Sequence, residues 1–122
     1  MEEGVNFREK LKAKMDYYVH RVYAVTKNFP REELYGVVSQ LRRAALSVIL
    51  NYVEGYARKI NNNDGYYRNF LNISYGSLKE SKYLIDFSFV EGFVSEDIHR
   101  ELVALADEIG AMLYRVKGFI IK

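Results

Sequence analysis

The sequence contains no cysteine, and this absence excludes several kinds of chemistry at once. Without a thiol the chain can form no disulfide, perform no thiol catalysis and offer no thiolate to a metal. Histidine is nearly absent as well. His20 and His99 fall in different predicted helices, and neither has a second histidine or an HExxH-type context nearby. We therefore expect no metal site and no cofactor.

Long hydrophobic runs are also missing. The longest, such as AALSVIL, are far shorter than the roughly 20 residues that a helix needs to cross a bilayer. The first residues, MEEGVNFREK, carry charges of both signs and lack the apolar region of a secretory signal. We therefore expect a cytoplasmic protein that makes no membrane contact.

Proline occurs once, at Pro30, and the other clear breaks are INNNDG at 60–65 and EGF at 91–93. Between these breaks lie four long segments without a linker, so residues 1–122 are predicted to form one domain. The predicted helices cover about 5–28, 31–59 and 66–90, and the fourth starts after an N-cap at Ser95. A length of 122 residues is enough for a hydrophobic core.

Apolar residues recur at steps of three or four in each segment, the spacing of an amphipathic helix. The expected core positions are Phe7, Leu11, Met15, Tyr18, Val22, Val25, Phe29, Leu34, Val38, Leu41, Ala45, Val48, Ile49, Tyr52, Tyr56, Tyr67, Leu71, Ser74, Leu78, Ile85, Phe89, Ile98, Leu102, Leu105, Ile109, Met112, Val116 and Phe119. Long helices joined by short loops predict an all-α, antiparallel up-down-up-down four-helix bundle.

The second predicted helix has more apolar surface than one flank of a small bundle covers. Besides its core face, it carries a second apolar strip about 100° away, made of Leu46, Leu50, Val53 and Ala57. Burial of this strip against another subunit explains the pattern, and self-association is therefore predicted. The alternative is that this helix lies centrally in its own bundle.

The same helix carries a continuous polar stripe of Gln40, Arg43, Ser47, Asn51, Glu54 and Arg58. The pairs Asn51 with Glu54, Glu54 with Arg58 and Arg43 with Ser47 have i,i+3 or i,i+4 spacing. YGSLKE on the third helix offers Gly76 and Ser77 for close backbone approach, with Glu80 one turn on. We interpret the stripe as a packing seam. A catalytic pair of Glu54 and Glu80 would need a cleft and a poised base, and no nucleophile accompanies them, so no enzyme is expected.

Three motifs in this region resemble one protein family. QLRRAALSVILNYVEGYAR is similar to the central motif of the bacterial four-helix-bundle proteins encoded in intervening sequences of 23S rRNA genes. FPREELYG before it and FLNISYGSLKE after it resemble that family's flanking segments, so the likeness covers about 29–80. Its signature residues here are Arg43, Ser47, Asn51, Glu54, Gly55, Gly76, Ser77 and Glu80. Ile49 and Leu50 depart from the family's usual proline and serine, which predicts a straighter second helix.

The resemblance implies a four-helix bundle that assembles into a ring, commonly a homopentamer, but it implies no activity. A related branch is the accessory variability determinant of diversity-generating retroelements, which is similar in fold and associates with a reverse transcriptase and template RNA. The partners that the resemblance implies are therefore a second copy of the chain, RNA or DNA, and a reverse transcriptase.

Charge is distributed unevenly along the chain, although its formal net value is only +2. In an up-down bundle, the start of helix one, the end of helix two, the start of helix three and the end of helix four share one end. This basic end would hold Arg8, Lys10, Lys12, Lys14, Arg58, Lys59, Arg68, Arg115, Lys117 and Lys122 against Glu2, Glu3, Glu9 and Asp64. The opposite, acidic end would hold Lys27, Arg31 and Arg100 against Glu32, Glu33, Asp86, Glu91, Glu96, Asp97 and Glu101.

A basic end repeated around a ring would attract polyanions, and exposed tyrosines would stack on unpaired bases. The candidate nucleic-acid-binding residues are Lys10, Lys12, Lys14, Arg58, Lys59, Tyr66, Tyr67, Arg68, Arg115 and Lys117. We hypothesise a non-enzymatic, ring-forming adaptor that binds RNA at this end. The alternatives are an accessory protein of a retroelement reverse transcriptase and a protein-interaction scaffold that binds no nucleic acid.

Overall fold

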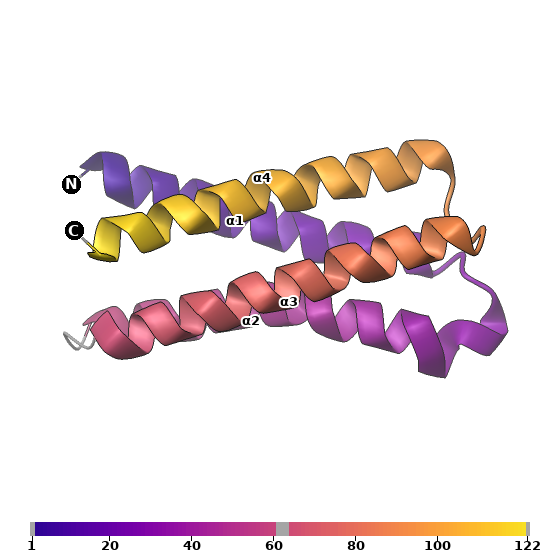
Figure 1. Ribbon diagram of the computed structural model, residues 1–122, viewed down its shortest axis with the longest axis horizontal. Coiled ribbons are helices and arrows are strands. Elements are labelled where there is room, and N and C mark those ends of the chain that lie inside the picture. Colours follow the sequence, from indigo (N-terminus) through magenta and orange to yellow (C-terminus); the bar gives the residue numbers. More distant parts are fainter. Residues whose placement is uncertain (1, 61–63, 122) are drawn as a thin grey trace.

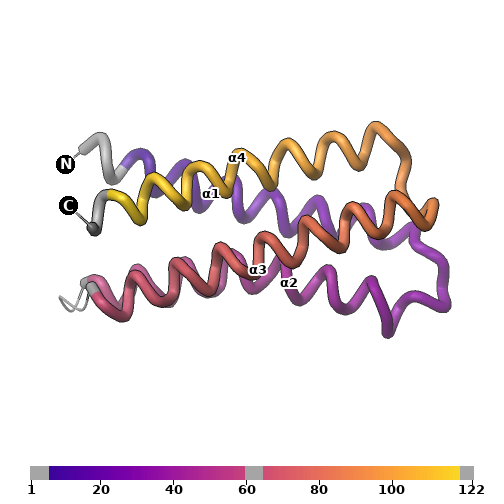
Figure 2. Tube along the Cα trace, viewed as in Figure 1, coloured from indigo at the N-terminus to yellow at the C-terminus, as the bar shows by residue number. Residues whose placement is uncertain are grey.

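Long antiparallel helices make up the computed structural model, which describes the backbone of residues 2–60 and 64–121 and the side chains of 6–59 and 65–118. They are α1 (Glu2–Thr26), α2 (Ser39–Ile60), α3 (Asp64–Val90) and α4 (Glu96–Ile121). The start of α1, the end of α2, the start of α3 and the end of α4 lie together at one end of the bundle (Figures 1 and 2). The up-down-up-down bundle is therefore confirmed.

The entry to α2 differs from the sequence-based prediction. A regular helix from Arg31 is wrong, because Arg31–Glu33 form a 3₁₀ turn and Leu34–Val38 a π-helical turn before α2 begins at Ser39. The irregularity centres on Gly36, whose φ of −112° and ψ of −113° are not helical. Glycine is among the weakest helix formers, so the chain departs from helical geometry there at low cost. From Ser39 the helix continues unbroken to Ile60.

The turn between α3 and α4 follows the pattern that the sequence predicts. Gly92 has φ of +82°, a left-handed conformation that suits glycine, and the Phe93 N–H donates to the Ser88 carbonyl at 2.8 Å. Ser95 then caps α4, since its Oγ accepts the Ile98 N–H at 3.2 Å. These local bonds fix α4 antiparallel to α3.

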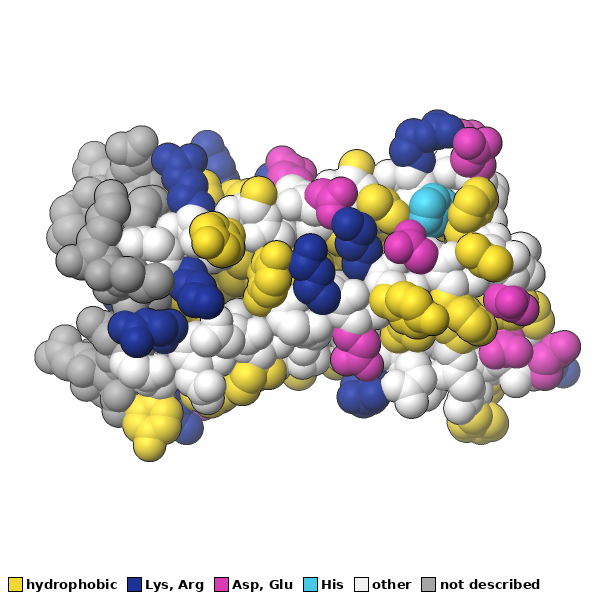
Figure 3. All heavy atoms as spheres, viewed as in Figure 1, with side chains coloured by type: hydrophobic (Ala, Val, Ile, Leu, Met, Phe, Trp, Pro, Cys, Tyr) yellow, Lys and Arg dark blue, Asp and Glu magenta, His cyan; other side chains and the backbone are white. Residues whose placement is uncertain are grey.

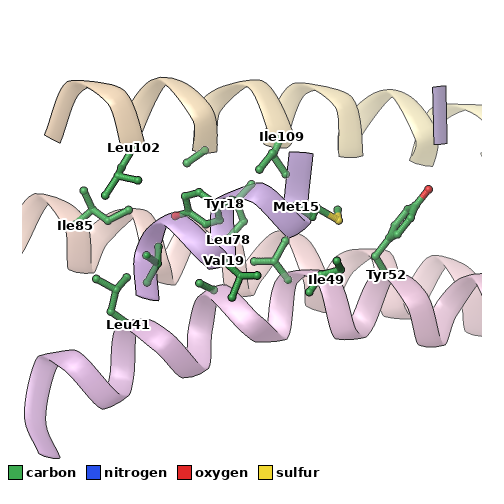
Figure 4. Packing of buried hydrophobic residues seen from close by; sticks show 14 of the residues in the cluster. Met15, Tyr18, Val19, Leu41, Ile49, Tyr52, Leu78, Ile85, Leu102 and Ile109 are labelled. Carbon is green, nitrogen blue, oxygen red and sulfur yellow. The ribbon is translucent and has the colours of Figure 1, made fainter. Parts of the chain in front are cut away.

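The core runs along the bundle axis, where the helices face one another. Figure 4 shows Met15 and Tyr18 of α1, Leu41 of α2, Leu78 and Ile85 of α3, and Leu102 and Ile109 of α4 meeting there. All of these side chains are buried. One buried polar pair lies among them: Tyr18 Oη and Ser81 Oγ are 2.7 Å apart, and burial raises the pKa of Tyr18 above its ordinary value.

Most of the expected core positions are buried, and Phe7, Ile98, Leu105 and Met112 are partly buried against the core, but three positions are exposed. Leu34, Tyr56 and Phe89 lie at or near the surface, so their assignment to the core is wrong. Leu34 leaves the core because it precedes the break at Gly36 and no longer shares the face of α2. The side chain of Phe119 lies outside the described residues. Over the part of the chain that is described, none of the helices has the length and hydropathy to cross a membrane.

Candidate nucleic-acid interface

The polar stripe of α2 lies along α3, which supports its interpretation as a packing seam. Ser47 Oγ is 2.8 Å from Ser77 Oγ, and the Arg43 guanidinium lies 3.8 Å from the Glu80 carboxylate. Beneath the stripe, the buried Ser74 hydroxyl donates to the Val48 carbonyl at 2.6 Å. The two helices are thus tied together by short side chains over several turns.

The pairs within the stripe are only partly those predicted. Arg58 bonds to Glu54 at 3.2 Å, as its i,i+4 spacing indicates. Asn51, in contrast, donates to both the carbonyl and the hydroxyl of Ser47 at 2.8 Å, rather than pairing with Glu54. Arg43 bonds to Gln40 and approaches Glu80 instead of pairing with Ser47. The Arg43 side chain is long enough to approach Glu80 on α3.

Close approach of the two backbones occurs at Gly55, not at Gly76. A Cβ added to Gly55 would lie 2.7 Å from the Phe70 Cβ and 3.2 Å from Tyr67 Cδ1. A Cβ added to Gly76 would meet nothing within 4 Å among the described residues, because Gly76 faces outward. The role predicted for Gly76 within the chain is therefore wrong, and Gly55 performs it.

Basic and acidic side chains separate toward opposite ends of the bundle. On the face of α3 and α4, Figure 3 shows lysines and arginines toward the end where α1 starts and in the middle, and carboxylates from the middle to the far end, where a few basic side chains also lie. The described basic residues of the first end are Arg8, Lys10, Lys12, Lys14, Arg58, Lys59, Arg68, Arg115 and Lys117. Glu2, Glu3, Asp64, Lys122 and the INNNDG loop contribute no described side chain or lie outside the described residues.

Several candidate residues at the basic end are available to a ligand. Lys10, Lys12 and Arg68 are exposed, and the Tyr66 ring is 56% exposed with the Arg58 guanidinium 6.0 Å from its centre. Arg115 is exposed and lies over the ring of Phe7 at 4.9 Å. Lys117, close to the end of α4, is half-buried.

Tyr67 cannot stack on a base, so its assignment as a stacking residue is wrong. Its side chain is fully buried, edge-on to Tyr56 at 6.3 Å, with the Lys59 ammonium 5.4 Å from the ring centre. Adjacent residues of a helix point about 100° apart, so Tyr66 faces solvent while Tyr67 faces the core. Lys14 is also less available than predicted, because it pairs with Glu108 at 3.2 Å.

The acidic end is held by ion pairs between helices. Arg21 donates through Nε and Nη2 to the two carboxylate oxygens of Glu101, both at 2.7 Å. The hydrogen bonds from Arg21 lower the pKa of Glu101. His99 Nε2 lies 2.7 Å from Asp86, and its ring stacks on Phe89 at 4.4 Å. Among the described residues, His, Asp and Glu form no group of three that could hold a metal.

A groove between α3 and α4 was missed by the sequence reasoning. It has a volume of about 330 Å³ and is lined by Tyr75, Lys79, Lys82, Asp107, Gly110 and Tyr114, among others. The signal was present in the sequence, because Arg68, Asn72, Tyr75, Lys79 and Lys82 recur at steps of four and three and thus share one face of α3. Lys82 and Asp107 pair at 2.6 Å, which raises the pKa of Lys82.

Comparison with solved structures supports the same architecture. The chain is similar to a protein of unknown function from the S23 ribosomal protein family of Bacteroides thetaiotaomicron, with a TM-score of 0.82 and 17% identity over 92% of this chain and 98% of that one. At this identity, the similarity shows the fold alone. None of the curated proteins matches the chain.

Comparison with protein families identifies the group to which the sequence belongs. The family described as 23S rRNA-intervening sequence protein matches residues 10–115, which include all of the seam between α2 and α3 and most of the basic end. The match extends well beyond the three motifs on either side, into α1 and α4. This chain is therefore a member of the 23S rRNA-intervening sequence protein family.

Proposed function

We propose that this protein is a non-enzymatic adaptor that self-associates and binds nucleic acid, specifically RNA, through the basic end of its bundle. The observation that carries the proposal is the segregation of charge. Nine cationic side chains occupy the described part of that end; Glu9 lies among them, and two of the nine, Lys14 and Arg58, pair with Glu108 and Glu54. Clustered cations bind the phosphate backbone by releasing its counterions, independently of sequence.

The chemistry of the seam supports a non-enzymatic function. Its polar side chains bond to one another or to the backbone of the neighbouring helix, as in the contacts of Ser47 with Ser77 and Ser74 with Val48. Such side chains are occupied in holding α2 against α3. Glu54 pairs with Arg58, and the Glu80 carboxylate lies 3.8 Å from Arg43.

Self-association is supported by the apolar strip on α2. Leu46, Leu50 and Val53 are between about a third and three-fifths exposed, and Leu50 is the most exposed at 56%. Leu50 lies about 160° around α2 from Val48, which faces α3, so the strip points away from the bundle. A ring is the closed form of a head-to-tail contact, and it would repeat the basic end once per subunit. Sedimentation of a monomer at micromolar concentration would refute this part of the proposal.

The direct test is RNA affinity at several salt concentrations, measured by fluorescence anisotropy with a labelled structured RNA. The variant Lys10→Glu/Lys12→Glu should bind more weakly than the unmodified protein. Its slope of log affinity against log salt concentration should be smaller by about 2, the contribution of two phosphate contacts. A matched control is Lys27→Glu/Arg31→Glu, which makes the same change in net charge at the acidic end and should bind like the unmodified protein.

Two outcomes would overturn RNA binding at the basic end. The first is the absence of binding by the unmodified protein at low salt, or binding that does not depend on salt. The second is equal loss of affinity in both charge-reversal variants, because that would reflect net charge rather than a located surface. The protein-interaction scaffold would then be the better hypothesis.

A further inference from the structure

The α3/α4 groove continues directly from the basic end. On α3, Arg68 stands at that end and Tyr75, Lys79 and Lys82 follow on the same side over about 21 Å, at 1.5 Å per residue. Because α4 is antiparallel to α3, Tyr114 and Lys117 accompany the first half of this run. Cationic and aromatic side chains therefore lie along the same face of α3 and α4, and Figure 3 shows basic and apolar side chains side by side along the middle of this face.

Two tyrosines stand at the groove with faces that a flat ring can cover. Tyr114 is 72% exposed, and no hydrogen bond or ring contact engages it within the described chain. Tyr75 is half-buried, with the Lys79 ammonium 5.2 Å from its ring centre. Gly110 also lines the groove and has no side chain; a Cβ added to it would lie 3.7 Å from the Tyr75 Cε1, so the groove stays open beside the Tyr75 ring. Large exposed aromatics beside a hollow are suited to stacking.

The charges along the groove suit a phosphate backbone over only part of its length. Lys79 makes no ion pair among the described residues, whereas Lys82 is paired with Asp107. Beyond Asp107 the neighbouring hollow between the same helices is lined by Glu96, His99 and Arg100. Arg100 there is paired with Glu96 and His99 with Asp86, so neither is free to bind a phosphate. Cationic side chains without an ion pair are thus confined to the part of the groove nearer the basic end.

We propose that this groove binds an unpaired stretch of single-stranded nucleic acid, with bases stacked on Tyr75 and Tyr114 and phosphates near Arg68 and Lys79. The inference rests on the proposed function and deepens it, because it specifies that the groove binds unpaired rather than base-paired nucleic acid. A duplex keeps its bases stacked on one another, so only an unpaired base can cover a tyrosine ring. RNA and DNA share this chemistry.

The test compares two exposed tyrosines, Tyr114 at the groove and Tyr83 toward the acidic end of the bundle. Tyr114→Ala removes the proposed stacking ring, and Tyr83→Ala removes a ring of similar exposure, 65%, toward the acidic end of α3. Affinity is measured by fluorescence anisotropy for a short oligouridine, the matching oligothymidine and a duplex of equal length. Tyr114→Ala should weaken binding of the single strands by about fivefold or more and leave duplex binding unchanged. Tyr83→Ala should change neither.

A second variant separates stacking from charge. Lys79→Gln should lower the slope of log affinity against log salt by about 0.7 for single strands, the contribution of one phosphate contact.

The groove is refuted as a single-strand site if Tyr114→Ala binds single strands like the unmodified protein, or if Tyr83→Ala loses as much affinity as Tyr114→Ala. In that case the proposal that RNA binds at the basic end is still supported, provided that Lys10→Glu/Lys12→Glu weakens binding. Absence of binding by the unmodified protein would refute both. Equal effects on oligouridine and oligothymidine indicate a site that does not read the 2′-hydroxyl, and a larger effect on oligouridine indicates RNA.

Discussion

The two sides of α3 differ in the size of the residues that face the neighbouring helix. Toward α2 the short side chains of Ser47, Ser74 and Ser77 make the hydrogen bonds, and Gly55 lets Phe70 of α3 pack directly on the α2 backbone, since a Cβ at Gly55 would lie 2.7 Å from the Phe70 Cβ. Toward α4 the facing residues are Tyr75, Lys79, Lys82 and Tyr114, with a groove between them. One helix therefore has a closed side and an open side.

This difference shows how a small bundle separates structure from binding. Small side chains allow backbones to come close, which buries polar groups in mutual bonds and leaves no room for a ligand. Long side chains extend from the backbone with their charged or aromatic ends in solvent, so they remain available. The signature residues Ser47, Gly55 and Ser77 lie on the closed side, whereas Tyr75 and Lys79 of the same motif region lie on the open side.

The largest expected effect tests the closed side. Gly55→Leu forces a side chain into the contact with Phe70 and should lower the free energy of unfolding by about 3 kcal/mol, at the upper end of overpacking costs. The matched variant Gly76→Leu meets no neighbour and gains helix propensity, so it should raise that free energy by up to about 0.8 kcal/mol. Urea denaturation followed by circular dichroism measures both.

A loss of stability in Gly76→Leu comparable to that in Gly55→Leu would contradict the comparison. It would mean that the face bearing Gly76 is covered, for example by another copy of the chain. Repeating the denaturation at several protein concentrations distinguishes that case, because the stability of an oligomer depends on concentration.

A smaller effect tests the open side. Asp107→Asn removes the carboxylate that holds Lys82 and should cost at most about 0.5 kcal/mol of stability, since both groups are partly exposed. It should also tighten single-strand binding about threefold, the effect of removing a unit charge about 7 Å from a phosphate in water. Anisotropy with the same oligouridine measures the change, and weaker binding by the variant would contradict the placement of a phosphate near Lys79, in the groove that Asp107 also lines.

The stability part of this prediction depends on pH in a defined direction. Asp107 raises the pKa of Lys82 above its ordinary value of 10.5, so the folded state holds the proton more tightly than the unfolded state. The contribution of the pair is then fully present below pH 10.5 and is lost as the pH rises through the raised pKa. The difference in unfolding free energy between the unmodified protein and Asp107→Asn should accordingly vanish in strongly alkaline solution.

The bundle could be predicted from the sequence because its signals are local. Steps of three and four in apolar residues define the buried faces, and Ser95 and the EGF turn mark the boundary of α4. The break at Gly36 could not be located in this way, because a glycine near the start of a helix is compatible with either a regular or an irregular turn.

The candidate site was predicted less completely, for a physical reason. Charge segregation follows from topology alone, so the basic end could be predicted. Burial of Tyr67 and pairing of Lys14 with Glu108 depend on how far each helix is rotated about its axis, which single residues do not reveal. The groove at Gly110 depends on the spacing between two helices, and this spacing is set by contacts of residues far apart in sequence.

The most direct test of the two-sided α3 is photo-crosslinking of a single-stranded RNA containing 4-thiouridine, with the modified peptides mapped by mass spectrometry. We expect adducts on Tyr114, Tyr75 or Tyr66, along the groove and the basic end. Adducts confined to peptides that carry Tyr35 or Tyr83, at the acidic end, would contradict it. So would adducts spread evenly over all exposed tyrosines, because they would show that α3 has no preferred binding side.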